Sequence, residues 1–226
     1  MSGEKDIGIA PPGYHQHYYS DRDWHAYAFL FARIVRYSQP GPVLDLGAGC
    51  GYLVEAANRW GVESIGLDGS PDAIEIAKQR FPEIDMRLHR LTEALPFEAS
   101  SFQTVVLNQV IEHLESRLFE FTMTEVFRVL RPGGMVLVLS PSKANKKERR
   151  ADPTHVNLIS PSELRQALTK YGFVNVVPFD SPLRFLGNSW IGQGIVFVVF
   201  KLLPLDALSA TANAFAYKKM TAGAAG

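Results

Sequence analysis

The chain has 226 residues, in which 23 Lys and Arg balance 23 Asp and Glu, so its formal net charge is zero. This length fits one compact domain and is short for two full-sized domains. The charge balance gives no overall positive potential of the kind that attracts nucleic acid. The single cysteine, Cys50, excludes an internal disulfide, and the N-terminus lacks the apolar core of a signal peptide. We therefore expect a cytoplasmic protein with no nucleic-acid partner.

The N-terminal part of the chain differs in character from the rest. Residues 1–20 form a polar leader, and residues 21–37 have the apolar spacing of an amphipathic helix. Short apolar runs then alternate with segments of helical character, and strands are expected at residues 42–46, 64–67, 86–89, 104–107, 135–139, 174–179 and 214–218. This alternation is typical of an α/β fold whose mostly parallel sheet carries helices on both faces, with a late strand inserted after a long connection.

The most informative motif is VLDLGAGCGYL, at residues 43–53, where an apolar run ends in Asp45. The loop that follows contains small residues that let the backbone approach a ligand closely: Gly47, Ala48, Gly49 and Gly51. Such a loop at the first strand-to-helix turn of an open α/β sheet indicates a nucleotide-type cofactor. Tyr52 stands where the dinucleotide fingerprint G-x-G-x-x-G has its third glycine, which argues against nicotinamide and flavin.

Later segments supply further parts of the same site. SIGLDGS, at residues 64–70, is a second apolar strand that ends in Asp68, roughly 20 residues beyond the glycine loop, where such folds place a carboxylate for ribose hydroxyls. A third apolar run is followed by Asn108 and Gln109, and RVLRPGGMVLVLSP, at residues 128–141, predicts a helix end, a turn and a long strand.

Together these motifs resemble the class I S-adenosylmethionine-dependent methyltransferases. The glycine loop, the LPF…SF segment and the RVLRPGG turn lie at matching intervals, and residues 155–173 look like the helix and strand that usually follow. The resemblance implies S-adenosylmethionine as cofactor and a Rossmann-like, doubly wound sheet of seven mostly parallel strands with the last strand antiparallel. It also implies two regions: an N-terminal lid and helix at residues 1–40, and a methyltransferase domain at residues 41–226.

The resemblance assigns roles around the cofactor. Asp45 orients the glycine loop or binds the cofactor's amino group, and Asp68, with Gly69 beside it, binds the ribose hydroxyls. The family usually places an aspartate after the third strand for the adenine amino group, but this chain has Leu91 there, which leaves Thr92 or a backbone group for that role.

Asn108 and Gln109 are expected to face the cofactor's methionine end and the acceptor. Next to them, NQVIEHL is similar to the E-x-x-E-H stretch of two metal-using groups, the ubiquinone-pathway O-methyltransferases and the small-RNA 2′-O-methyltransferases. Glu112 and His113 match that stretch, and His155 aligns with a downstream histidine of the quinone group. Because Gln109 replaces the first glutamate, we expect no metal and assign His113 or His155 as general base, with a divalent cation on Glu112, His113 and His155 as the alternative.

Two further segments are expected to cover the acceptor. In the resembling family the leader forms a lid, and the aromatic and imidazole side chains that would line it here are Tyr14, His17, Tyr18 and Tyr19. An apolar insertion at residues 182–208 is interrupted by Lys201 and Pro204, so it predicts no transmembrane segment. It would serve as an apolar lid, a homodimer face or a peripheral membrane contact, in that order of preference.

The sequence thus predicts an enzyme that transfers the methyl group of S-adenosylmethionine to a small, partly apolar acceptor, at oxygen. A metal-assisted quinone-type or RNA 2′-O-methyltransferase is one alternative. A protein that binds S-adenosylmethionine without catalysis is the other.

Overall fold

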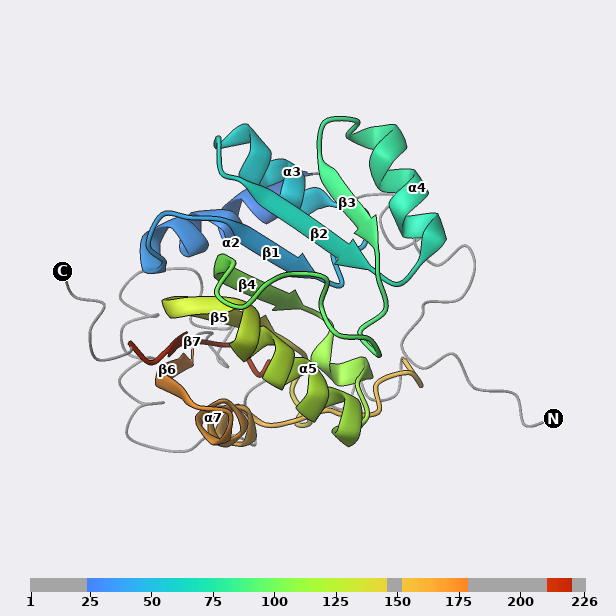
Figure 1. Cartoon of the computed structure of the whole chain (residues 1–226). Coiled ribbons are helices and arrows are strands. Elements are labelled where there is room, and N and C mark those ends of the chain that lie inside the picture. The colour runs from blue at the N-terminus through green and yellow to red at the C-terminus, as the bar shows by residue number, and fades with distance from the viewer. Residues whose placement is uncertain (1–23, 146–151, 179–210, 221–226) are drawn as a thin grey trace, which may run out of the picture.

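A seven-stranded sheet runs through the part of the chain that the computed structural model describes, residues 24–145, 152–178 and 211–220 (Figure 1). In chain order the strands are β1 (Val43–Leu46), β2 (Ser64–Asp68), β3 (Asp85–Leu88), β4 (Phe102–Asn108), β5 (Leu130–Leu139), β6 (Phe173–Pro178) and β7 (Ala214–Lys218). Their spatial order is β3-β2-β1-β4-β5-β7-β6. β7 pairs antiparallel with both β5 and β6, whereas the pairs from β3 to β5 are parallel, as the sequence predicts.

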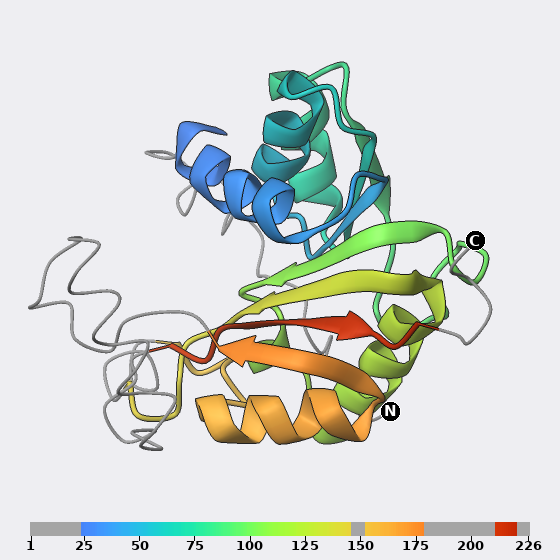
Figure 2. The same ribbon diagram turned by 90° about the vertical axis from the view of Figure 1, so that its left-hand side faces the viewer.

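Helices cover both faces of this sheet (Figure 2). On one face lie α2 (Trp24–Tyr37), α3 (Tyr52–Arg59) and α4 (Pro71–Arg80), and on the other lie α5 (Ser116–Val129) and α7 (Pro161–Lys170). A short 3-10 helix, η1 (Ile111–His113), follows β4. None of the helices in these described ranges is both long and apolar enough to cross a membrane.

The alternation of side chains along β1 explains how both faces are filled. Leu44 and Leu46 point into the larger hydrophobic cluster, which includes Met123 and Val126 of α5. Val43 points the other way, into a cluster with side chains from α2 and α3. Because β1 is buried on both faces, it reads as a continuous apolar run apart from Asp45.

β5 begins at Leu130, earlier than the strand predicted from residue 135. The predicted Pro-Gly-Gly turn lies inside this strand as an irregularity, because its pairing with β4 passes from Leu130 opposite Phe102 to Met135 opposite Thr104. Gly133 takes a left-handed φ of 77° there, and a Cβ on it would lie 2.6 Å from the Met220 sulfur. The turn motif therefore encodes a bulge within the strand.

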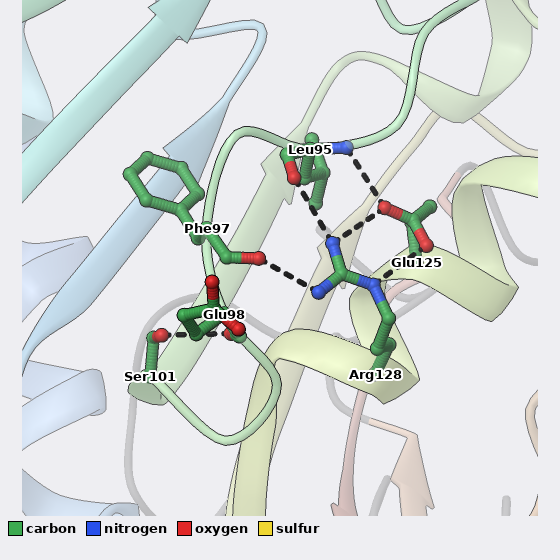
Figure 3. Close-up of polar contacts among 6 residues, drawn as sticks. All are labelled: Leu95, Phe97, Glu98, Ser101, Glu125 and Arg128. Carbon is green, nitrogen blue, oxygen red and sulfur yellow. Dashed lines mark hydrogen bonds and ion pairs between the residues drawn. The ribbon is translucent and has the colours of Figure 1, made fainter.

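The LPF segment, at residues 95–97, is joined to α5 and to the start of the RVLRPGG motif by Glu125 and Arg128 (Figure 3). The Arg128 guanidinium donates to the Phe97 carbonyl at 2.7 Å and to the Leu95 carbonyl at 3.0 Å. Glu125 accepts from the Leu95 amide at 2.8 Å and pairs with Arg128 at 2.7 Å. A charged pair on α5 thus fixes the backbone of the LPF segment ahead of β4.

Candidate active site

The candidate site lies where the parallel strands end. β1 has β2 on one side and β4 on the other, so the strand order reverses at β1 and the loops that follow these strands diverge. The glycine loop follows β1, Asp68 ends β2, and Asn108 ends β4. All three are therefore at the same edge of the sheet, as the sequence predicts.

The glycine loop owes its shape to backbone geometry. Gly47, Gly49 and Gly51 have left-handed φ angles of 70°, 53° and 76°. The Gly47 and Ala48 amides donate to the Leu67 carbonyl at 2.8 and 3.0 Å, which holds the loop against the end of β2. A Cβ at Gly47 would lie 2.5 Å from Val110, so a side chain there would collide with the segment after β4. The loop brings the N-terminus of α3 to the sheet edge, where backbone amides favour negatively polarised groups.

Asp68 holds the glycine loop in place. One carboxylate oxygen accepts from the Gly49 amide at 2.8 Å and the other accepts from the Ser70 amide at 2.8 Å. The sequence suggested Asp45 either for orienting the loop or for binding the cofactor's amino group, and the structure adds a contact between Asp68 and the loop through the Gly49 amide. Each oxygen of Asp68 keeps a second lone pair, which is what binding of ribose hydroxyls requires.

Asp45 lies beneath the loop with 4% of its surface exposed. Among the described residues, no hydrogen-bond donor reaches its Oδ1. Burial, and then the nearby charge of Asp68, raise the pKa of Asp45 to about 8. A buried carboxyl group of this kind fits a cationic ligand group, which would supply the missing partner.

Cys50 is fully buried inside the glycine loop. Burial raises the pKa of its thiol to about 11, so at neutral pH it is protonated and acts as a small packing residue.

The remaining residues assigned to the cofactor surround this centre. Gly69 is half-buried in the bend after β2, and Leu91 and Thr92 form a turn after β3. Leu91 packs against the larger hydrophobic cluster, whereas Thr92 is exposed. Asn108 is half-buried, and the exposed Gln109 takes a left-handed φ of 59° while its amide donates to the Leu139 carbonyl at 2.8 Å.

Glu112, His113 and His155 come together beside these residues. Asn157 joins the two segments, since its amide donates to the Glu112 carbonyl at 2.9 Å and its side chain donates to the Ile111 carbonyl at 3.1 Å. The His113 and His155 ring centroids lie 4.9 Å apart. One ligand atom from each of the three residues lies within 4.8 Å of the other two, which could hold a divalent cation. Glu112 is completely buried.

Asp152 and Thr154 also belong to this cluster, and sequence reasoning missed both. Asp152 Oδ1 accepts from the Thr154 amide at 2.8 Å and from its hydroxyl at 2.5 Å. Thr154 Oγ1 lies 3.0 Å from Nδ1 of His113, and Asp152 Oδ2 lies 3.6 Å from Nε2 of His155. The order Asp-Pro-Thr is a signal for a local Asx turn, but it does not reveal the link to His113.

Two groups of predicted residues lie outside the part that the structure describes. They are the lid side chains Tyr14, His17, Tyr18 and Tyr19, and the apolar insertion at residues 182–208.

Comparison with known proteins agrees with this architecture. A family model described as a methyltransferase domain matches residues 14–177. A relative from Mycolicibacterium smegmatis, named as a probable S-adenosylmethionine-dependent methyltransferase, is 32% identical over 178 residues, which are 76% of this chain and 65% of the relative. The chain belongs to the class I S-adenosylmethionine-dependent methyltransferase family. S-adenosylmethionine is the cofactor that this methyltransferase family uses.

Other similar proteins fit the same family. The ubiquinone biosynthesis O-methyltransferase of Brucella anthropi is 28% identical over 166 residues, which are 66% of this chain and 66% of that protein. The structure of a methyltransferase from Archaeoglobus fulgidus superimposes with a TM-score of 0.69 at 18% identity and covers 91% of this chain and 100% of its own, which shows the shared methyltransferase fold. The chain spans about two thirds of the length of the curated relatives named here.

Proposed function

We propose that this protein transfers the methyl group of S-adenosylmethionine to a small, partly apolar acceptor, and that the methylated atom is a hydroxyl oxygen. The observation that carries the proposal is the pair of imidazoles, His113 and His155, at the sheet edge where Asp45 and Asp68 surround the glycine loop. A neutral imidazole near a hydroxyl acceptor is suited to taking its proton. The relative from Brucella anthropi is named as an O-methyltransferase, which supports oxygen as the acceptor atom.

Within this proposal the residues divide into three groups. Asp68 binds the ribose hydroxyls, Asp45 binds the ammonium group of the methionine part, and the glycine loop supplies backbone contacts. Around the adenine and the methionine end we place Gly69, Leu91, Thr92, Asn108 and Gln109. The acceptor would be covered by residues 1–40 and by the apolar insertion at residues 182–208. The alternative roles of this insertion are a homodimer face and a peripheral membrane contact.

The methyl transfer itself is an in-line displacement, and the chain contributes by positioning. The residues at the ends of β1 and β2 hold the cofactor. His113 or His155 takes the proton of the acceptor as the methyl group is transferred.

The first experiment is calorimetric titration with S-adenosylmethionine and S-adenosylhomocysteine. The Asp68→Asn side chain keeps only one carbonyl oxygen, which two backbone amides and the ribose would have to share. We therefore expect the affinity of the variant for both compounds to fall at least about tenfold. This loss corresponds to one lost hydrogen bond to a charged group. Asp72→Asn, an exposed carboxylate on α4, is the matched control and should bind as the wild type does. If the wild type binds NADH and neither sulfur compound, the proposal is wrong.

The acceptor is then tested with isotope-labelled S-adenosylmethionine and paired compounds that differ only in a hydroxyl or an amine. Methyl transfer to the hydroxyl member of a small aromatic pair supports the proposal. Transfer only to amines would contradict the assignment of oxygen, and cofactor binding without transfer to any acceptor would favour a non-catalytic binding protein.

A metal-assisted reaction is the second candidate, because Glu112, His113 and His155 offer ligand atoms within 4.8 Å of one another. A divalent cation there would polarise the acceptor hydroxyl and lower its pKa. Titration with Mg²⁺, Mn²⁺ and Zn²⁺ in the absence of cofactor tests this candidate. Binding that Glu112→Gln abolishes, together with chelator-sensitive methyl transfer, would favour it over a metal-free base.

A further inference from the structure

The segment at residues 152–155, with the sequence DPTH, brings a carboxylate, a hydroxyl and an imidazole next to η1. The Thr154 hydroxyl stands between Asp152 Oδ1, at 2.5 Å, and Nδ1 of His113, at 3.0 Å. This hydroxyl has one proton and two neighbours that both lie within hydrogen-bond distance. The direction in which it donates therefore decides where His113 carries its own proton.

The direction follows from the state of Asp152. Asp152 Oδ1 accepts from the Thr154 amide at 2.8 Å, and a backbone amide that donates to a carboxyl oxygen favours its ionised form. Asp152 is therefore a carboxylate at neutral pH and can only accept. The Thr154 proton goes to Asp152, which is the shorter and charge-assisted contact, and Thr154 Oγ1 is left to accept from Nδ1–H of His113.

We propose that Asp152 and Thr154 are positioning residues that fix His113 as the Nδ1–H tautomer and leave its Nε2 as the atom that receives the proton of a hydroxyl acceptor. This inference rests on the proposed function for the identity of the acceptor, but the tautomer itself does not.

Asp152 also faces the second imidazole. Its other oxygen lies 3.6 Å from Nε2 of His155, whose side chain is 7% exposed. In the described part of the chain no hydrogen-bond partner reaches Nδ1 of His155. One carboxylate thus faces both rings, directly for His155 and through Thr154 for His113.

The chemical step balances with these residues. His113 Nε2 takes the hydroxyl proton while the new oxygen–methyl bond forms and the carbon–sulfur bond of the cofactor breaks, with its electron pair staying on sulfur. The positive charge that leaves the sulfonium appears as the imidazolium of His113. Asp152 stabilises that imidazolium through the chain from Nδ1–H to Thr154 and from Thr154 to the carboxylate.

The test is a two-dimensional ¹⁵N–¹H spectrum of the histidine rings in the full chain at pH 7.5, with His113 assigned from the signals that His113→Gln removes. We expect a protonated, pyrrole-type Nδ1 and an unprotonated, pyridine-type Nε2. Thr154→Val removes the hydroxyl at nearly constant volume and should shift the ring to the Nε2–H tautomer, whereas Thr154→Ser should retain the wild-type pattern. Thr169→Val, which removes a surface hydroxyl on α7, is the control and should change nothing.

A kinetic measurement completes the test once a hydroxyl acceptor has been found. Thr154→Val should lower kcat at least about tenfold with little change in KM, and Thr154→Ser should restore it, since general base catalysis contributes about 100-fold or more. An Nε2–H tautomer in the wild type, or an unchanged tautomer in Thr154→Val, overturns the inference. Absence of cofactor binding and methyl transfer would instead contradict the proposed function, and the spectrum would still decide the tautomer.

Discussion

The buried carboxyl group of Asp45 links the site to the stability of the protein. Its pKa of about 8 in the folded state lies above its ordinary value of 3.8, so between these two values the folded state binds a proton that the unfolded state has lost. The contribution of Asp45 to the free energy of unfolding therefore falls as pH rises from about 4 to about 8, with a slope of up to about 1.4 kcal/mol per pH unit.

Asp45→Asn removes this titration. We expect the free energy of unfolding of the variant, relative to that of the wild type, to increase between pH 5.5 and pH 8.5. Urea unfolding of both proteins at several pH values in that range measures the difference, and Asp72→Asn is the control for loss of a surface carboxylate. Parallel pH profiles for the wild type and Asp45→Asn would contradict the raised pKa.

At this scale the sequence predicts which residues gather but not how they share hydrogen bonds. The strand-end positions of Asp45 and Asp68 follow from the apolar runs before them, so the sheet edge was predictable. Which carboxylate meets the Gly49 amide depends on the left-handed turns of the loop, which no residue pattern specifies. The sequence does not predict the roles of Thr154 and Asp152, because their partner, His113, belongs to a different segment.

At the scale of elements, the pair Glu125 and Arg128 joins α5 to the segment before β4. Arg128→Met removes the guanidinium that the Leu95 and Phe97 carbonyls and Glu125 share, and we expect a loss of about 2–3 kcal/mol in the free energy of unfolding, measured with urea at pH 7. The hydrogen bond from Arg128, the largest cause, lowers the pKa of Glu125 below 4.5, so the contribution of the pair is complete above that pH and is lost as pH falls through the lowered value.

Lys170→Met is the matched control for this prediction. It removes a contact of similar length, 2.8 Å to Glu120, between side chains that are 65% and 56% exposed. Solvent screens such a pair, so the free energy of unfolding should change little. If Arg128→Met lowers the free energy of unfolding no more than Lys170→Met does, the pair Glu125 and Arg128 does not stabilise the LPF segment.

The elements were predictable where apolar spacing is regular. Every strand except β5 lies within two residues of its expected bounds. β1, β2, β4 and β7 are apolar runs whose ends are marked by polar or glycine residues, which explains why their bounds were predictable. β5 was predicted to begin too late, since Pro and Gly normally end a strand, and here they form a bulge that pairing with β4 tolerates. The bulge depends on pairing with a neighbouring strand, and the local sequence pattern around it carries no information about that pairing.

At the scale of the whole molecule, the strands differ in how many neighbours protect them. β1 and β4 each lie between two strands and are buried along their lengths, apart from the half-buried last residue of β4, whereas β3 and β6 form the two edges and carry exposed residues. We expect the amides of β1 and β4 to exchange with solvent most slowly, and those of β3 and β6 at least about tenfold faster. Hydrogen exchange followed by mass spectrometry measures this order. Equal protection of β3 and β4 would contradict it.

The fold as a whole was predictable because the order of motifs, more than any one of them, corresponds to a known topology. The alternation of strands and helices predicts the parallel part of the sheet, and the resemblance to methyltransferases predicts the antiparallel last strand. The cluster of Thr154, Asp152 and His113 was not predictable to the same degree, since its members lie in two segments that are distant in sequence and no single motif encodes their contact.

The position of β7 has a consequence for the synthesis of the protein. β6 precedes β7 in the chain, yet it pairs with no other strand of the described sheet than β7, which also supplies the second neighbour of β5. On the ribosome, β5 therefore presents an open edge and β6 has no place in the sheet until residues 214–218 have emerged. Translation that stops just before this short segment would cost the protein two strands instead of one.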